Sequence, residues 1–355
     1  MDMVCAQTED CTKDMSREGL DLRTDGTYVW ADKTSLGGDD CIAVATALAI
    51  LADDSLPHPP LEVVFTIDEE TGMDGAAALD CSDLKGRLLL NLDSEEEGVF
   101  TVACAGGLRA DCFLPAARQA LGGESCFSVS LSGLQGGHSG AEIHKNRANA
   151  NKVMGDFLGR IQKLMPLCLT SFSGGSKDNA IPRACQATVV AMGIGLERIN
   201  DIAAQLQQEV RETYDEPEAL VQAFDVDALG GNALTTAATA DVISLLCAAP
   251  NGVQAYCPDM PELVQTSLNL GIAKLGDRFT ATFSVRSSVN AEKEGLITKL
   301  KELADFYNGA YSQSGTYPAW EFKKGSRLRD VMVPIYTRMF GKEPKVLAIH
   351  AGLEC

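Results

Sequence analysis

The chain has 355 residues, of which 45% are hydrophobic, so it is long enough for two domains and a large core. Its formal net charge of −19 argues against nucleic acid or an anionic membrane surface as a partner, because both would repel the protein. The sequence shows no apolar run of the roughly 20 residues that cross a membrane, and no basic segment followed by an apolar one at its start, so neither membrane insertion nor secretion is expected.

The twelve cysteines are scattered without a CxxC pair, which is typical of a protein from the reducing cytosol. Only four histidines are present, His58, His138, His144 and His350. A site that needs several imidazoles therefore has few candidate residues.

The first quarter of the chain places acidic residues beside apolar segments. After a short strand or hairpin arm over residues 26–32, Leu36-Gly-Gly-Asp-Asp40 leads into an apolar, small-residue segment that ends at Leu51. This pattern predicts a loop that enters a buried helix. Asp39 or Asp40 can cap the helix, and capping explains only one of the two aspartates.

Residues 61–67 are the next apolar segment, and they predict a buried strand that runs into Asp68, Glu69 and Glu70. Like charges in a partly desolvated place are tolerated when a cation neutralises them or when one carboxylate keeps its proton. The segment therefore indicates either a metal site or a solvated acidic loop after a core strand.

Residues 86–92 repeat this design, because a predicted apolar strand again ends in acids, residues 93–97. Glu95, Glu96 and Glu97 are typical of a solvated run. Ligands of open α/β sheets gather outside the carboxyl ends of the strands, so we expect the acids of the three segments to converge there.

After Gly98 the pattern predicts an antiparallel section, since strands at residues 99–107, 109–114 and 126–133 follow one another without a crossover helix. Further strands are predicted at residues 167–172, 185–192, 263–271 and 278–286. Helices are predicted at residues 149–165, 196–214, 218–224, 235–248 and 292–307. This order is typical of an α+β layer with helices on one face. Towards the end of the chain the pattern again predicts α/β structure, with a helix at residues 328–340 and an apolar strand after residue 345.

Three side chains after the acidic segments are candidates for chemistry. His138 lies in Gly136-Gly-His-Ser-Gly140, where the backbone can approach a ligand closely, although such loops also occur as plain turns. Arg286, at a strand end, can grip a carboxylate with two parallel hydrogen bonds, and Asn179 is a weaker candidate. The sequence has no GxSxG elbow and no Walker-type phosphate loop. Acidic clusters with few histidines therefore indicate a divalent-metal hydrolase with a nearby Glu as general base.

These motifs resemble those of the aminoacyl-histidine dipeptidases, dinuclear zinc metallopeptidases related to carnosinase and aminoacylase. The resemblance covers nearly the whole chain. Its carriers include Leu36-Gly-Gly-Asp-Asp40, Asp68-Glu-Glu-Thr-Gly72, Asn91-Leu-Asp-Ser-Glu95, Gly136-Gly-His-Ser-Gly140, Asn179-Ala-Ile-Pro-Arg183, Thr266-Ser-Leu-Asn-Leu-Gly271 and Ile349-His-Ala-Gly-Leu-Glu-Cys355.

The resemblance implies an α/β metallopeptidase catalytic domain, with a mixed sheet between helices, over residues 1–106 and 316–355. It places an inserted α+β lid domain at residues 107–315. The implied activity is the metal-dependent hydrolysis of dipeptides, of the Xaa-His type or of broad specificity, in the cytoplasm. A small peptide is the implied partner, and a homodimer through the lid domain is left open.

Residue by residue, the resemblance implies that Asp39 bridges two zinc ions, with Glu70 on one ion and Asp93 on the other. Cobalt and manganese are the alternative metals. Glu69 matches the general base that acts on a metal-bridging water. The other matching residues are Asp2, which orients a metal histidine, His138, which polarises the scissile carbonyl, and Asn179, Arg286, His350 and Glu354, which bind the substrate or lie beside it.

The sequence departs from the family pattern at both metal histidines. One belongs two positions before Asp2, and the other belongs beyond Cys355, so neither position is in this chain. We therefore expect weak metal binding by an oxygen-only site, which suits magnesium or manganese better than zinc. We interpret the chain as truncated at both ends.

Two other interpretations stay open. The same fold serves enzymes that hydrolyse N-acyl amino acids, so these compounds are alternative substrates. Without both metal histidines, the chain could also be a catalytically inert fragment that keeps the fold.

Overall fold

The computed structural model describes residues 3–354 of the chain except residues 95, 123–125, 192 and 227–231. The chain divides into two compact units. Unit 1 comprises Met1–Thr101, Lys324–Leu347 and Leu353–Cys355, and unit 2 comprises Val102–Lys323 and Ala348–Gly352. The domain limits expected from the sequence, at residues 106/107 and 315/316, stay a prediction. Within the described ranges, no helix has the length and apolar character needed to span a membrane.

Unit 2 is built on a nine-stranded sheet with the order β11-β6-β10-β8-β14-β15-β4-β16, in which β13 also pairs with β14. All these pairings are antiparallel, as the sequence predicts. The strands are β4 (Gly106–Pro115), β6 (Cys126–Ser132), β8 (Leu167–Gly174), β10 (Cys185–Ala191), β11 (Leu220–Val226), β13 (Gly252–Cys257), β14 (Met260–Leu275), β15 (Arg278–Ser287) and β16 (Ala310–Tyr317).

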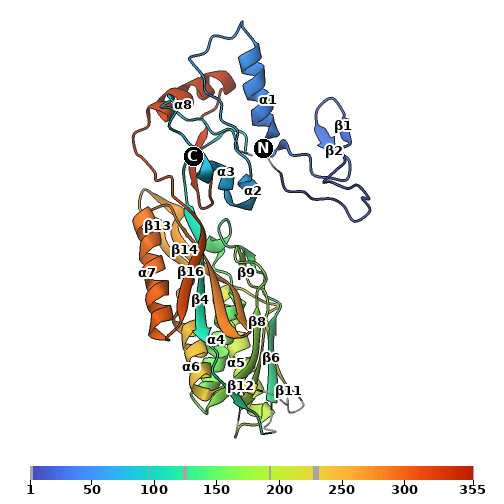
Figure 1. The fold of residues 1–355 in the computed structure, drawn as a ribbon, viewed down its shortest axis with the longest axis vertical. Helices are drawn as coiled ribbons and strands as arrows, with labels where there is room; N and C mark the ends of the chain where they lie inside the picture. Colours follow the sequence, from blue (N-terminus) through green and yellow to red (C-terminus); the bar gives the residue numbers. More distant parts are fainter. Residues whose placement is uncertain (1–2, 95, 123–125, 192, 227–231, 355) are drawn as a thin grey trace. The chain divides into compact units, whose positions relative to one another are not determined.

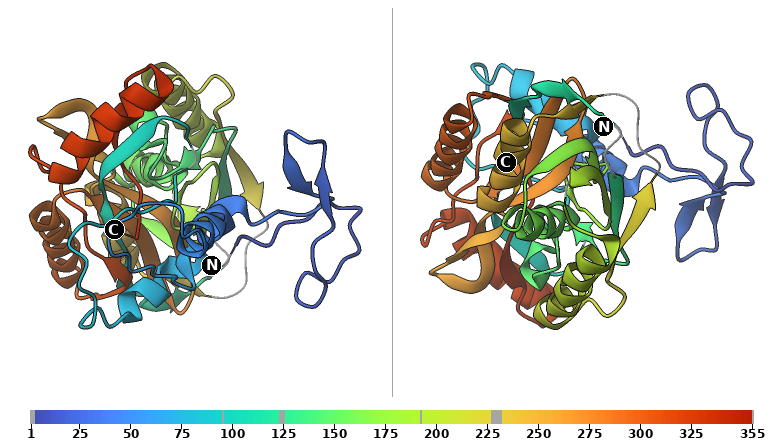
Figure 2. Two further views of the ribbon diagram at one scale, coloured as in Figure 1. Left: turned by 90° about the horizontal axis from the view of Figure 1, so that it is seen from above. Right: turned by 90° about the horizontal axis from the view of Figure 1, so that it is seen from below.

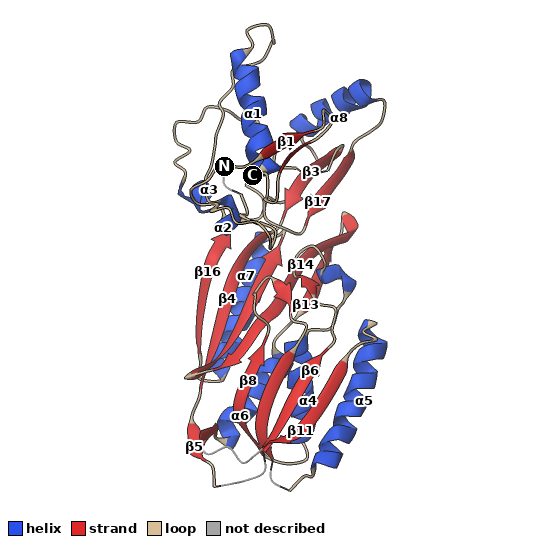
Figure 3. Cartoon of the chain, turned by 90° about the vertical axis from the view of Figure 1, so that its right-hand side faces the viewer, coloured by secondary structure: helices blue, strands red, loops and turns tan. Residues whose placement is uncertain are grey.

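One face of this sheet is covered by helices (Figures 1 and 3). They are α4 (Ala150–Gln162), α5 (Leu196–Tyr214), α6 (Thr236–Ala248) and α7 (Asn290–Phe306). Two short ribbons accompany the sheet: β5 (Arg118–Ala120) pairs with β12 (Asn232–Leu234), and β7 (Gly137–His138) pairs with β9 (Ala180–Ile181). The one-faced α+β layer predicted from the sequence is therefore present in unit 2.

Unit 2 contains the same order of elements twice. With the short ribbons and β13 left aside, strand–helix–strand–strand–helix–strand occurs as β6-α4-β8-β10-α5-β11 and again as β4-α6-β14-β15-α7-β16. In each repeat the fourth strand, β11 or β16, is outermost in the sheet and is followed inward by the first, third and second strands. The second strands of the two repeats, β8 and β14, meet through the pairs Ala273↔Gly174 and Lys274↔Ser173. The sheet thus consists of two ferredoxin-like repeats that join along one line, the repeat seam.

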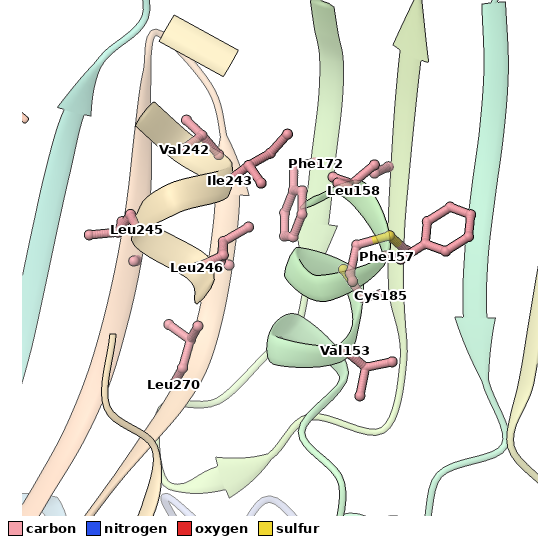
Figure 4. Close-up of a cluster of buried hydrophobic side chains, with 14 of the residues drawn as sticks. Val153, Phe157, Leu158, Phe172, Cys185, Val242, Ile243, Leu245, Leu246 and Leu270 are labelled. Atoms are coloured by element: carbon pink, nitrogen blue, oxygen red, sulfur yellow. The ribbon is translucent and has the colours of Figure 1, made fainter. Parts of the chain in front are cut away.

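The main hydrophobic core lies in unit 2, and α4 packs against α6 within it (Figure 4). Phe157 and Leu158 of α4 are fully buried, as is Leu246 of α6. Gly155 permits this close approach, because a Cβ atom there would lie 2.6 Å from the Cβ atom of Leu246. The side chain of Asn149 caps the start of α4 by accepting hydrogen bonds from the two N–H groups of residues 151 and 152.

The helix predicted at residues 218–224 is wrong, because residues 220–224 belong to strand β11. Val221 and Ala223 are buried, whereas Gln222 and Phe224 are exposed. This period of two matches a strand with one face on the helices. Pairing with β6 along the whole of β11 also supplies backbone hydrogen bonds that a helix of two turns would lack.

Unit 1 contains helices α1 (Gly38–Ala52), α2 (Glu69–Gly72), α3 (Asp74–Ala78) and α8 (Arg327–Phe340). Strands β1 (Leu22–Thr24) and β2 (Val29–Ala31) form a hairpin that extends away from α1 (Figure 2). Strand β3 (Val99–Cys104), whose first residues belong to unit 1, pairs with β17 (Lys345–Ile349).

The buried strands predicted at residues 61–67 and 86–92 are absent from unit 1, where both segments are extended loops. Their large apolar side chains are mostly exposed, as for Ile67 and Leu89, which are 57% and 64% exposed. Helix α1 forms as predicted, but none of its residues is buried. An apolar segment becomes a buried strand only when another strand accepts its backbone hydrogen bonds, and no described strand pairs with either segment.

Candidate functional site

The acids of unit 1 meet at the start of α1. Asp39 and Asp40, which are joined by a cis peptide bond, occupy the non-helical first turn of this helix. The carboxyl group of Asp93 is hydrogen-bonded to the side chain of Asp39. The pKa of Asp93 is raised to about 7, chiefly by burial and then by this hydrogen bond and the nearby charges of Asp39, Asp40 and Glu69. The carboxyl group of Asp93 is therefore partly protonated near neutral pH.

Glu69 approaches these acids from α2. The preceding residue, Asp68, has a left-handed backbone with φ 57°, which turns the chain into the helix. Gly75 completes the turn, because its N–H donates to the carbonyl of Ile67 at 3.1 Å, and a Cβ atom at residue 75 would lie 2.1 Å from that oxygen. The turn places the Glu69 carboxylate where its charge acts on Asp93.

Glu354 belongs to the same unit and is bound by two residues that the sequence did not single out. The hydroxyl of Thr66 donates to its carboxylate, and the Asn91 amide donates to its backbone carbonyl at 3.1 Å. Asn91 also accepts a 2.6 Å hydrogen bond from the N–H of Asp93. Oε1 of Glu354 is buried and has no hydrogen-bond partner among the described residues. Asn91 was detectable in the sequence, since it opens the motif that contains Asp93.

The predicted metal ligands are only partly brought together. Asp39 and Asp93 are in contact, but in the part of the chain that is described no three His, Cys, Asp or Glu side chains form a group that could hold a metal ion. The Asp39–Asp93 pair itself fits a hard divalent cation, because carboxylate oxygens are the ligands such a cation prefers and its charge offsets the repulsion between two adjacent carboxylates. Asp2 lies outside the described residues.

A second group of predicted residues meets in unit 2 around Gly140, and we call it the Gly140 cradle: His138, Gly140, Arg286 and His350. A Cβ atom at Gly140 would lie 2.8 Å from the backbone oxygen of His350, 3.1 Å from Cε1 of His138 and 3.2 Å from Nε of Arg286. Only a residue without a side chain therefore fits between these groups.

The hydrogen bonds of His138 fix its tautomer. Its Nδ1 atom accepts from the backbone N–H groups of Gly140 at 3.2 Å and of Ala141 at 3.0 Å. Nδ1 is therefore unprotonated, and the ring hydrogen is on Nε2. Burial lowers the pKa of His138, and the positive charge of Arg286 lowers it further. His138 thus presents a neutral Nε2–H donor.

Two polar side-chain atoms at the cradle are buried without a hydrogen-bond partner among the described residues: Nε of Arg286 and the hydroxyl of the neighbouring Ser139. Nη1 of Arg286 donates to the hydroxyl of Tyr317 at 3.1 Å. Nε2 of His350 lies 2.7 Å from the hydroxyl of Ser267. Burial and the charge of Arg286 lower the pKa of His350 to about 4, so this ring is also neutral at pH 7.

Asn179 is joined to the cradle through the backbone. Its carbonyl accepts a 2.9 Å hydrogen bond from the N–H of Ser139, and β9, which follows it, pairs with β7 through His138↔Ala180. The side chain of Asn179 is exposed. Sequence reasoning missed Ser139 and Ser267, although both lie inside motifs that it quoted. Tyr317 carried no signal.

Comparison with known proteins shows that the chain is similar to peptidases. A family model described as "Peptidase dimerisation domain" matches residues 129–218. The cytosol non-specific dipeptidase of Escherichia coli (strain K12) is 36% identical over 358 residues, which cover 100% of this chain and 74% of that relative. The crystal structure of an aminoacylhistidine dipeptidase from Vibrio alginolyticus matches with a TM-score of 0.90 and 34% identity, over 100% of this chain and 73% of that one.

Proposed function

The chain belongs to the family of the cytosol non-specific dipeptidases, and from this premise we propose that it hydrolyses dipeptides by a metal-dependent mechanism. The predictions of family and fold class made from the sequence are confirmed: the chain matches the fold of a dipeptidase of this family, with helices packed on a sheet and a dimerisation domain. The E. coli relative is named a non-specific dipeptidase, which favours broad specificity over strict Xaa-His specificity.

The observation that carries this proposal is the Gly140 cradle. A dipeptide ends in a free carboxylate, which needs positively charged or N–H donors when it leaves water. Arg286 supplies a guanidinium whose Nε is buried and unpartnered among the described residues, so a substrate carboxylate would satisfy a group that the protein alone leaves unpaired. We assign Arg286, with Asn179 and His350 beside it, to the carboxylate end of the substrate.

We assign His138 to the scissile carbonyl. Hydrolysis of an amide places negative charge on the carbonyl oxygen, and a preorganised N–H donor stabilises that charge. The Nε2–H of His138 is such a donor, since two backbone N–H groups hold Nδ1 and thereby fix the ring. A neutral ring does not lose its proton to solvent during the cycle.

The acids of unit 1 are assigned to the metals and to proton transfer. Asp39, Asp93 and Glu70 would hold two divalent ions, with zinc, cobalt and manganese as candidates. When bound, such ions polarise the carbonyl and make water a better nucleophile. Glu69 takes a proton from the attacking water and passes it to the leaving amine. Asp2 would orient a metal ligand, and Glu354 would border the site.

Two assignments concern the setting of the enzyme. A cytoplasmic location is supported by the word "cytosol" in the name of the E. coli relative. A homodimer through the lid domain, residues 107–315, is supported by the match to a dimerisation domain. Because the repeat seam already pairs β8 with β14, a second copy would have to use another surface, such as the outer edges of β11 or β16.

The proposal is tested by a substrate panel with the purified protein and saturating zinc or manganese. We expect hydrolysis of alanyl-histidine and alanyl-alanine, and inhibition by a chelator that is reversed by added metal. N-acetyl amino acids share the free carboxylate but lack the free amine, so preferential cleavage of these compounds would assign the chain to the acylases. Absence of hydrolysis of both classes at saturating metal would support an inert protein.

A further inference from the structure

Buried asparagines line the repeat seam next to the Gly140 cradle. Asn149 and Asn151 belong to the first repeat, and Asn269 lies on β14 of the second repeat. Their exposed fractions are 4%, 0% and 0%. Burying an amide side chain costs free energy unless its polar atoms are hydrogen-bonded, so the hydrogen-bond partners of these side chains indicate what the side chains stabilise.

The side-chain N–H groups of Asn269 donate hydrogen bonds to the loop that carries Asn179. Its Nδ2 donates to the carbonyl of Asp178 at 3.0 Å and to the carbonyl of Ala180 at 2.9 Å. Its Oδ1 accepts from Nδ2 of Asn149 at 3.1 Å. The orientation of the amide is thereby fixed, because the opposite one would direct an oxygen at two carbonyl oxygens. Asn269 therefore holds the residues on both sides of Asn179.

Gly271, two residues further along β14, lets the same loop pack closely against the strand. A Cβ atom at Gly271 would lie 2.4 Å from the oxygen and 2.6 Å from the Cα atom of Asp178. The loop thus rests directly on the backbone of β14, where any side chain would displace it. We call Asn269 and Gly271 together the β14 seat.

The seated loop also holds His138. The carbonyl of Asn179 accepts from the N–H of Ser139, and β9 pairs with β7 through Gly137↔Ile181 and His138↔Ala180. Beneath this ribbon, Ile181 packs in a small buried cluster with Ile143 and Val264. A shift of residues 178–180 would therefore be passed by backbone hydrogen bonds to His138.

We propose that Asn269 and Gly271 are positioning residues, which seat the loop at residues 177–180 on β14 and through it fix Asn179 and His138 for the substrate. Neither residue is placed in contact with the substrate; both act through the loop. The inference rests on the proposed function for the roles of Asn179 and His138, whereas the seat itself rests on contacts within unit 2.

The test compares isosteric variants of two buried asparagines. Asn269→Asp directs a carboxylate oxygen at the carbonyls of Asp178 and Ala180, and Gly271→Ala displaces the loop by volume alone. Asn151→Asp is the matched control, because Nδ2 of Asn151 donates to the carbonyl of Leu270 at 3.2 Å at the same seam, and among the described residues its side chain has no hydrogen bond to residues 177–180. Should Asn269→Asp fail to fold, Asn269→Ala removes the same donors without adding charge.

The first measurement is hydrogen exchange by mass spectrometry on the full chain without substrate. We expect the peptides that cover residues 137–141 and 177–181 to exchange about tenfold faster in Asn269→Asp and Gly271→Ala, as the loss of two buried hydrogen bonds predicts. In the control, exchange of these peptides should stay within about twofold of the wild type. Unchanged exchange in both seat variants, or equal acceleration in the control, would overturn the proposal.

The second measurement is the affinity for alanyl-histidine with zinc present, in a Glu69→Gln background that prevents turnover. The seat variants should bind about tenfold more weakly than the control, and equal affinity would overturn the role in substrate binding. Binding of this dipeptide by the Glu69→Gln protein with an unaltered seat tests the proposed function separately. If that protein fails to bind, the proposed function is wrong, and the exchange result still decides whether the seat exists.

Discussion

Arg286→Met tests whether the Gly140 cradle recognises a carboxylate. The half-buried guanidinium bonds Tyr317 through Nη1, and its Nε is unpartnered among the described residues. Hydrogen bonds to charged groups contribute about 1.5–3 kcal/mol each, and partial exposure reduces the Coulomb attraction, so we assign about 3 kcal/mol to the pair that Arg286 forms with the substrate. That energy corresponds to roughly 150-fold in kcat/KM at 25 °C.

The assay compares alanyl-alanine with alanyl-alaninamide, which lacks the carboxylate. The wild type should prefer the acid by roughly 150-fold, and Arg286→Met should reduce this preference to within about threefold. Arg286→Lys keeps the charge but loses the planar fork, so its preference should be intermediate.

Arg109→Met is the matched control, since Arg109 lies on β4 of the same sheet and pairs with Asp111 at 3.1 Å. This variant should keep the wild-type preference. If Arg286→Met still prefers the acid as strongly as the wild type does, Arg286 does not bind the substrate carboxylate.

Three further predictions concern the cradle and the core. Gly140→Ala should abolish dipeptide binding, because its methyl group would occupy the space between the cradle side chains. The control Gly159→Ala should retain binding, since a Cβ atom there would lie 3.5 Å from its nearest neighbour. Equal binding by both variants would contradict the proposed role of the cradle. Phe157→Ala should lower the free energy of unfolding by about 3–5 kcal/mol in urea denaturation, and a change below about 1 kcal/mol would contradict its burial in the core. His350, with a folded pKa of about 4 against 6.5 unfolded, should leave stability unchanged above pH 6.5 and lower it as pH falls from 6.5 toward 4. Its NMR titration should move to higher pH in Arg286→Met, and a pKa that stays near 4 would show that the arginine charge does not act on this ring.

The fold of unit 2 was predictable because its signals are local. Alternating strands and the amphipathic helix at α4 are encoded by residue spacing, and antiparallel neighbours need only short connections. The duplication of the repeats was missed, since it is expressed in strand order and not in similar sequence motifs. Segment 218–224 was misread because a short apolar run fits either period, and only pairing with β6 decides.

The residue types of the candidate site could be predicted from the sequence, but much of its geometry could not. Asp39 and Asp93 were expected to converge, and they do, but the argument relied on two buried strands that unit 1 lacks. Burial depends on partners far away in the sequence, which periodicity cannot supply. Asn269 was part of a quoted motif, but its role depends on the carbonyls of a distant loop.

The most direct test of the central claim is the kinetics of Glu69→Gln at saturating zinc with alanyl-histidine. The account predicts a loss of about 10²–10⁴ in kcat, as for removal of a general base, with thermal unfolding and metal binding retained. Glu96→Gln, in the exposed acidic run, is the matched control and should keep full activity. A Glu69→Gln protein as active as the wild type would contradict the proposed mechanism.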